Sequence, residues 1–259
     1  MLEPRSEMKP VNDIGTAESA WKSFYKVGGV TALLTVAVVL AEIGITFLPG
    51  VERASQATVT VIDWFTLFQD HWFLGLRNLG LLNLIGAVLL APTFLAMYSA
   101  VRRGHEAYAA LATILFFVGL AAYFASSRAF PMLFLSGQYA SATTETQRSL
   151  FIAAGQAMLA EGQSRAGLPL VEFACLVISI VMLKGNVFGK ATAYAGVLGN
   201  VLLMVVEIIL TVLRTLPGWG MAIAVGAGLA MMTWYFLVSR GLFQLASSSR
   251  RLADIAALG

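Results

Sequence analysis

Charged residues are scarce in this chain. They make up 12% of the 259 residues, whereas soluble globular proteins carry about 25%. Hydrophobic residues make up 58%, and the mean hydropathy is +0.79. The shortage of charge arises from several long apolar runs, each close to the ~20 residues that a helix needs to cross the hydrocarbon core. The composition therefore predicts an integral membrane protein with several spans.

Cysteine and histidine are also scarce. Cys175 is the single cysteine, so the chain can form no internal disulfide and no cysteine-based zinc or iron–sulfur site of its own. His71 and His105 are the two histidines, which excludes a metalloenzyme with several histidine ligands. The sequence also has no nucleotide-binding glycine loop with lysine and no HExxH motif. We therefore expect no metal or cofactor, and the dispersed net charge of +3 gives no indication of nucleic-acid binding.

The apolar runs predict an all-α bundle of six transmembrane helices. The expected spans cover residues 27–48, 78–101, 106–127, 168–183, 191–213 and 220–239. Residues 1–24 form a polar tail without the pattern of a secretory signal, residues 25–245 form the membrane domain, and residues 246–259 form a second tail. Pro92 falls inside the second span, where we expect it to kink the helix.

The distribution of basic residues predicts the orientation in the membrane. Every lysine falls on the side that holds the N-terminal tail, the connections after the second and fourth spans, and the C-terminal tail. That side also holds more basic residues in total than the opposite side. Because basic residues are retained on the cytoplasmic side, we expect both termini to be cytoplasmic.

Two segments on the extracytoplasmic side are neither spans nor plain loops. Residues 59–75 are dense in aromatic side chains, which is typical of a belt at the membrane–water interface. Residues 129–167 contain a predicted helix with Thr143 or Thr144 as its N-cap. The predicted apolar face of that helix holds Leu150, Ala154, Ala157 and Met158. We expect both segments to form amphipathic interfacial helices that lie against the membrane face and cap the bundle.

Ionisable residues inside spans cost free energy and need a partner or a function. Three glutamates fall in the extracytoplasmic half of the predicted spans, with arginine and asparagine side chains at the same level. We therefore predict a polar chamber there that binds a ligand, lined by Glu42, Arg77, Asn83, Arg128, Glu172 and Glu207. The alternative is that these groups only form interhelical ion pairs and hydrogen bonds that fix the bundle.

The stretch before the second span adds candidates for the rim of this chamber. Asp63, Asp70 and Arg77 recur at seven-residue spacing, so on a continuous helix they would share one face. His71 follows Asp70 and would lie at the same rim. The alternative is that Asp70 and His71 are solvated residues of an amphipathic helix, and for His71 we favour this interpretation.

Small residues in the last span predict a packing surface. Gly220, Ala224 and Gly228 recur at four-residue spacing, which allows another helix to approach closely. The pattern is typical of packing within a bundle, and the alternative is a homodimer or a membrane-protein partner.

Two motifs connect the chain with a group of known proteins. The second span ends near a basic pair in AMYSAVRRGHEAYAAL, and the extracytoplasmic side contains YASATTETQRSLFIAAGQAML. Over about residues 25–245 the chain resembles an uncharacterised bacterial family of six-span integral membrane proteins, a domain of unknown function. The resemblance implies a multi-pass protein of the bacterial inner membrane and supplies no catalytic or binding residues.

These observations leave three functions open. The leading hypothesis is a non-enzymatic membrane protein that binds a small or lipid-like ligand in the chamber, as a sensor or transport component. An accessory or structural subunit of a larger membrane complex is the first alternative. A membrane-embedded enzyme with a carboxylate general base is the second, and no catalytic residue can be assigned for it. The lipid bilayer is the partner that every one of these hypotheses requires.

Overall fold

The computed structural model describes residues 12–46, 60–160, 167–213 and 217–256. Every regular element in these residues is a helix, which confirms the predicted all-α class. The helices are α1 (Asn12–Thr46), α2 (Val61–Asp70), α3 (Trp72–Asn78), α4 (Leu81–Ala125), α5 (Ala129–Ser141), α6 (Glu145–Ala160), α7 (Leu168–Lys184), α8 (Lys190–Leu213) and α9 (Gly218–Ala256).

Several of these helices are suited to a membrane. The stretches long and apolar enough to cross one are Trp21–Ile45, Leu81–Ser141, Lys190–Leu210 and Gly218–Ser247. This is the pattern of a multi-pass membrane protein. The expected second and third spans both lie in α4, and α7 covers the shorter fourth span.

Helix α4 folds back on itself near its middle. Its backbone leaves the helical conformation at His105, with φ −149° and ψ 54°. Phe94 and Phe116 lie on opposite sides of this break, and their stacked rings have centroids 4.2 Å apart. On a straight helix these residues would be about 33 Å apart, so α4 consists of two antiparallel halves, 81–104 and 106–125. The break lies at His105, in the connection expected between the second and third spans, and Pro92 lies within the first of the two halves.

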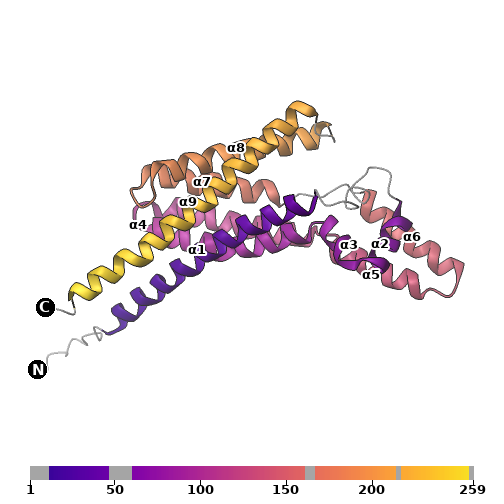
Figure 1. The fold of residues 1–259 in the computed structure, drawn as a ribbon, viewed down its shortest axis with the longest axis horizontal. Coiled ribbons are helices and arrows are strands. Elements are labelled where there is room, and N and C mark those ends of the chain that lie inside the picture. The colour runs from indigo at the N-terminus through magenta and orange to yellow at the C-terminus, as the bar shows by residue number, and fades with distance from the viewer. Residues whose placement is uncertain (1–11, 47–59, 161–166, 214–216, 257–259) are drawn as a thin grey trace, which may run out of the picture.

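The long helices pack as a bundle in which each contacts the next. Helix α1 packs on α4, α4 on α7, α7 on α8, α8 on α9, and α9 again on α1. Their shared core includes the rings of Phe94, Phe116 and Trp234. Helix α1 begins and α9 ends at the same end of the bundle, which we call the terminal end (Figure 1).

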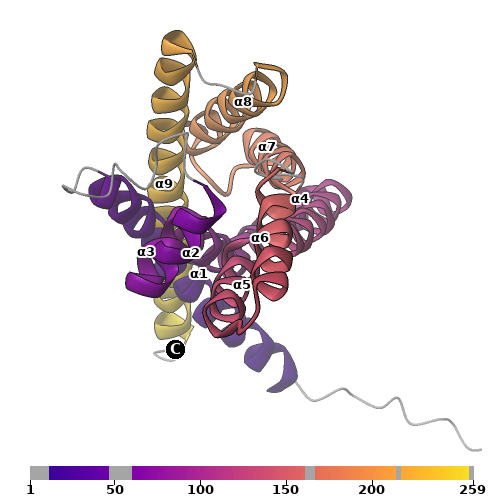
Figure 2. The same cartoon turned by 90° about the vertical axis from the view of Figure 1, so that its right-hand side faces the viewer.

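The remaining helices, α2, α3, α5 and α6, form a small unit at the opposite end, which we call the cap (Figures 1 and 2). The cap has a hydrophobic core of its own, made by Val61, Phe65, Phe68, Leu76, Ala129 and Met132. The buried Ser136 hydroxyl of α5 donates to the carbonyl of Phe65 in α2 at 2.9 Å. The two segments that were expected as interfacial helices therefore pack against each other.

Helix α6 begins where the sequence predicted. The amide of Gln147 donates to Thr144 Oγ1 at 3.2 Å, and Gln147 Oε1 accepts from the Thr144 amide at 3.3 Å. This reciprocal arrangement is a capping box, which satisfies amides that the first turn of a helix leaves unpaired. Thr144, one of the two predicted residues, is therefore the N-cap.

The predicted apolar face of α6 is confirmed at Met158 and is wrong at Leu150. Leu150 is 64% exposed, and the side chains packed against the cap core are Phe151, Ile152, Met158 and Leu159. Gly155 explains the difference, because a Cβ there would lie 2.6 Å from Val61 Cγ1 of α2. The glycine lets α6 approach α2 closely, and the larger side chains beside it then bury more apolar area than Leu150 and the alanines could.

The small-residue stripe of α9 is only partly used inside the bundle. Gly220 is buried and Ala224 is half-buried. A Cβ on Gly228 would meet no atom of the described residues within 4 Å. Packing within the bundle therefore accounts for Gly220 and not for Gly228.

Candidate functional site

Arg77 ties the cap to the bundle. This side chain belongs to α3 and is only 5% exposed. Its Nη2 lies 3.1 Å from Glu42 Oε1 of α1 and donates to the Glu42 carbonyl at 3.0 Å. Its Nη1 donates to Asn78 Oδ1 at 2.9 Å. A buried guanidinium is tolerable because a carboxylate and two further oxygens face it.

The turn after α3 gives Arg77 this position. Gly80 has φ 95°, a left-handed conformation that glycine adopts without steric cost. The amide of Gly80 donates to the Arg77 carbonyl at 2.9 Å, and the Gly80 carbonyl accepts from Leu84 at 3.0 Å. The chain therefore passes from α3 into α4 within two residues, which keeps Arg77 beside the end of α1.

The other predicted chamber residues lie in the same part of the bundle. Glu42 is about 6 Å before the end of α1, Glu172 about 6 Å after the start of α7, and Glu207 about 9 Å before the end of α8. Glu172 is buried at 7% exposure, and Glu207 is half-buried. Arg128 is half-buried at the N-cap of α5, and its Nη2 is enclosed by protein. All of these charges are therefore on the cap side of the bundle.

Close helix contact holds Glu172 in place. A Cβ on Gly119 of α4 would lie 2.8 Å from the Gly167 carbonyl and 2.9 Å from the Val171 nitrogen. The start of α7 is therefore seated directly on the second half of α4, with backbone against backbone. Glu172 is the next residue after Val171, and it is buried in the interior of the bundle at this contact.

The structure brings Glu42 and Arg77 into direct contact, which is the kind of interhelical ion pair that the alternative to a ligand site expects. Asn83 differs from the expectation, because it is exposed in the first turn of α4. Arg128, Glu172 and Glu207 each interact with a neighbouring group. Charges of both signs therefore lie near the cap-side ends of the bundle helices among the described residues.

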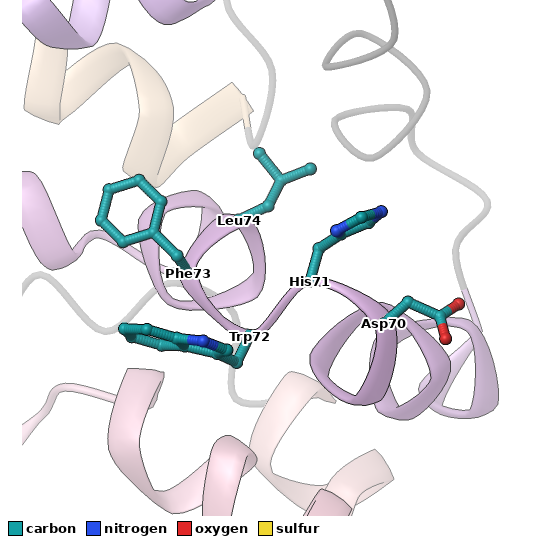
Figure 3. A pocket seen from close by; sticks show the side chains of 5 residues that line it. All are labelled: Asp70, His71, Trp72, Phe73 and Leu74. Carbon is teal, nitrogen blue, oxygen red and sulfur yellow. The ribbon is translucent and has the colours of Figure 1, made fainter.

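The predicted rim residues do not share one helix. The backbone breaks at His71, with φ −144° and ψ 68°, so α2 ends there and α3 begins. Seven-residue spacing places residues on one face only when they belong to one continuous helix. The expectation that Asp63, Asp70 and Arg77 share one face is therefore wrong, because Arg77 lies on α3. Asp70 and His71 are exposed and, with the three residues that follow, line an open hollow of 380 Å³ (Figure 3).

Asp63 has a local structural role. The Asp63 amide donates to Thr60 Oγ1 at 3.3 Å and the Thr60 amide donates to Asp63 Oδ2 at 2.8 Å, which forms the capping box of α2. The Thr60 hydroxyl also donates to Asp63 Oδ2 at 2.7 Å. Hydrogen bonds from the Thr60 side chain and backbone lower the pKa of the Asp63 carboxyl below its usual value of 3.8.

A second polar group lies inside the bundle, and the sequence alone indicated only its asparagine, as an amide deeper in the membrane. Asn200 of α8 is 1% exposed, and Ser179 of α7 and Trp234 of α9 are fully buried. The Asn200 amide nitrogen donates to the Gly196 carbonyl at 2.7 Å. Asn200 stands out in an apolar run and was a detectable signal, whereas serine and tryptophan are common in membrane helices.

No three histidine, cysteine, aspartate or glutamate side chains gather into a potential metal site within the described ranges. Comparison of the chain with known protein families, curated proteins and solved structures found no match.

Proposed function

We propose that the chain crosses the membrane six times, with both termini in the cytoplasm and the cap outside a bacterial inner membrane. The hairpin in α4 supports two crossings in that helix, and α1, α7, α8 and α9 supply one each. The start of α1 and the end of α9 lie together, as an even number of crossings requires (Figure 1).

Side chains at the two ends of the bundle support this placement. At the terminal end, Tyr108 and Tyr194 are 61% and 62% exposed, as aromatic residues in an interfacial belt are. Arg102 lies over the Trp21 ring, 5.5 Å from its centroid, at the same end. Trp219 begins α9 at the opposite end and is 59% exposed. The lysines at the terminal end give it the charge of a cytoplasmic side.

Within this topology, we propose that the protein binds a small or lipid-like ligand with a polar head, as a sensor or transport component. The carrying observation is the buried Arg77–Glu42 pair, which places charge at the junction between a separate cap and the bundle. Charged side chains are costly in a membrane and mark ligand or ion sites more often than not. Glu172, Glu207 and Arg128 surround the same level and extend the site into the bundle.

An accessory subunit of a larger membrane complex is the alternative, and one observation favours it. Gly228 leaves open space on α9, next to the exposed side chains of Val225 and Leu229. A stripe of this kind admits the close approach of a helix from another chain or from a second copy.

Native mass spectrometry of the gently extracted full chain tests the proposal. The variants are Glu42→Gln and Glu207→Gln, and Glu145→Gln is the matched control because its side chain is 88% exposed in the cap. We expect a small molecule on the wild type and on the control, and its loss from both bundle variants.

Two outcomes would contradict the proposal. A molecule retained equally by all variants would bind elsewhere on the protein. A stoichiometric protein partner with no small molecule would favour the accessory-subunit function instead.

A further inference from the structure

A line of polar side chains runs through the interior between α7, α8 and α9. Glu172, Cys175 and Ser179 follow each other on one face of α7, with exposures of 7%, 3% and 0%. The spacing of three and four residues keeps them on the same side of the helix. Along the α7 axis, no step between these groups or to the end of the helix exceeds about 8 Å.

Helices α8 and α9 extend this line. Thr192, Gly196 and Asn200 recur at four-residue spacing on α8, and Thr192 is 6% exposed near the terminal end. On α9, Trp234 is fully buried and Tyr235 is 8% exposed. Tyr235 is part of the same buried core cluster as Cys175 and Trp234, so we assign it to the same line.

The three helices meet at Gly196. A Cβ at this position would collide with Ser179 Oγ of α7 and would lie 2.5 Å from Trp234 Nε1 of α9. The missing side chain therefore allows a hydroxyl and an indole N–H to approach the α8 backbone, one turn from Asn200. The Ser179 hydroxyl donates to the Cys175 carbonyl at 2.7 Å and can still accept a hydrogen bond.

Two buried atoms at this point need a hydrogen-bond partner. Asn200 Oδ1 and Trp234 Nε1 are enclosed and have none among the described residues. The orientation of the amide is fixed, because its nitrogen must face the Gly196 carbonyl that accepts from it. Among the described residues, Asn200 Oδ1 is therefore an acceptor without a donor, and Trp234 Nε1 is a donor without an acceptor. A water molecule is a partner that suits either atom, since water accepts from an indole N–H and donates to an amide oxygen.

We propose that this line, which we call the polar seam, is a path for protons across the membrane. Water held by Asn200 and Trp234 joins the hydroxyls of Ser179 and Thr192 to the Glu172 and Tyr235 end of the seam. A proton from the cap side binds the Glu172 carboxylate. Glu172 then gives this proton to a neighbouring hydroxyl or water. Each hydroxyl or water along the seam accepts one proton and passes another on, until a proton is released at the terminal end. One proton crosses for each one taken up, and no group is oxidised or reduced.

The chemistry of the seam favours protons over metal cations. Glu172 is its one carboxylate, and the groups beyond it are neutral hydroxyl, amide and indole groups. Hard cations are usually bound with the help of several carboxylates, and no group of three acidic, histidine or cysteine side chains occurs among the described residues. Hydroxyls in a row with water need only to exchange hydrogen bonds. The proposal goes beyond the ligand site at the cap, because Asn200 and Trp234 are not part of that site.

Proton flux into proteoliposomes tests the path. The full chain is reconstituted in phosphatidylcholine vesicles loaded with potassium chloride and a pH-sensitive dye, and valinomycin then sets the membrane potential. We expect a proton flux above that of protein-free vesicles, and at least a tenfold lower flux with Asn200→Leu or Trp234→Phe. Thr233→Val is the matched control, because Thr233 is exposed and its hydroxyl bonds only to the Leu229 carbonyl of its own helix.

The variants also separate a blocked path from a damaged fold. Trp234→Phe keeps a smaller aromatic ring at this buried position and removes the N–H donor, so it decides the result if Asn200→Leu proves unstable. Size-exclusion profiles and helical circular dichroism must match those of the wild type. A wild-type flux equal to that of empty vesicles, or a folded Trp234→Phe variant with full flux, would overturn the proposal. Neither result depends on whether a ligand binds near Arg77.

Discussion

The Arg77–Glu42 contact leads to a quantitative prediction about how the cap is held. The perturbation is a double-mutant cycle of Glu42→Gln, Arg77→Met and the double variant. The chain contains a matched second pair, Arg148–Glu145, in which Arg148 Nη1 lies 3.3 Å from Glu145 Oε1. The two pairs have similar separations, 3.1 Å and 3.3 Å, and differ mainly in burial.

Burial sets the expected coupling energies. The side chains of Arg77 and Glu42 are 5% and 31% exposed, against 47% and 88% for Arg148 and Glu145. A hydrogen bond between charged groups out of water contributes about 1.5–3 kcal/mol, so we expect a coupling of about 2 kcal/mol for the buried pair. An exposed pair three residues apart on a helix contributes about 0.3–0.5 kcal/mol. Arg77→Met and the double variant both lose the hydrogen bonds of Arg77 to the Glu42 carbonyl and to Asn78. The free energy of these bonds therefore cancels in the coupling energy.

The assay is reversible unfolding of each variant in mixed detergent micelles, followed by circular dichroism. Each cycle gives a coupling free energy from four unfolding free energies measured in the same micelles. A coupling for Arg77–Glu42 no larger than that for Arg148–Glu145 would refute the reasoning. The pair would then not be a desolvated link between cap and bundle, and the site argued from it would lose its main support.

Two further predictions concern helix packing and pH. Gly119→Ala should lower the free energy of unfolding by about 1–3 kcal/mol, because the added Cβ would lie too close to backbone atoms at the start of α7. Gly226→Ala is the control. Its Cβ would meet no atom of the described residues within 4 Å, so this variant should be neutral or stabilising in the same unfolding assay. Asp63 has a lowered pKa through its hydrogen bonds from Thr60, so its stabilisation of α2 is present above the unfolded pKa and is lost as pH falls through the folded value. Hydrogen-exchange protection of the first turn of α2 should therefore fall as the pH drops below the usual carboxyl pKa of 3.8 in the wild type and not in Asp63→Asn, and equal pH dependence in both would contradict this.

Much of the bundle could be predicted because hydrophobic length is a strong signal. The antiparallel halves of α4 correspond to two expected spans, and the basic connection between them contains the break at His105. The cap could not be predicted as a unit. Its aromatic side chains are compatible with packing on lipid or on each other, and the sequence alone does not choose. Phe65 and Phe68 are buried in the cap core, whereas Trp72 and Phe73 are exposed.

The break between α2 and α3 also had no local signal. Neither glycine nor proline occurs at Asp70, His71 or Trp72, and these are the residues that usually indicate the end of a helix. The break arises from tertiary packing, since α2 and α3 each contact α5. The rim hypothesis depended on one continuous helix, and it failed for this reason.

The site was predictable to the extent that its residues are rare. Glu42 and Arg77 stood out because ionisable groups seldom occur beside apolar runs. Their contact across 35 positions of sequence, from α1 to a cap helix, could be found only in three dimensions. Trp234 gave no signal, because tryptophan in a membrane helix usually lies at the interface and here it is fully buried.

The position of the polar groups along the bundle follows the cost of burying each kind. An ionised side chain at the centre of a bilayer costs about 2.5–3.5 kcal/mol on insertion scales, and the cost falls toward the interface. Glu42, Glu172 and Glu207 all lie within about 9 Å of the cap-side ends of their helices. The groups found deeper, Ser179 and Asn200 among them, are neutral and bond to their own helix backbone. The three glutamates of the long apolar helices thus lie where the cap and water can solvate them, and the deeper polar groups Ser179 and Asn200 avoid the cost of burying a charge.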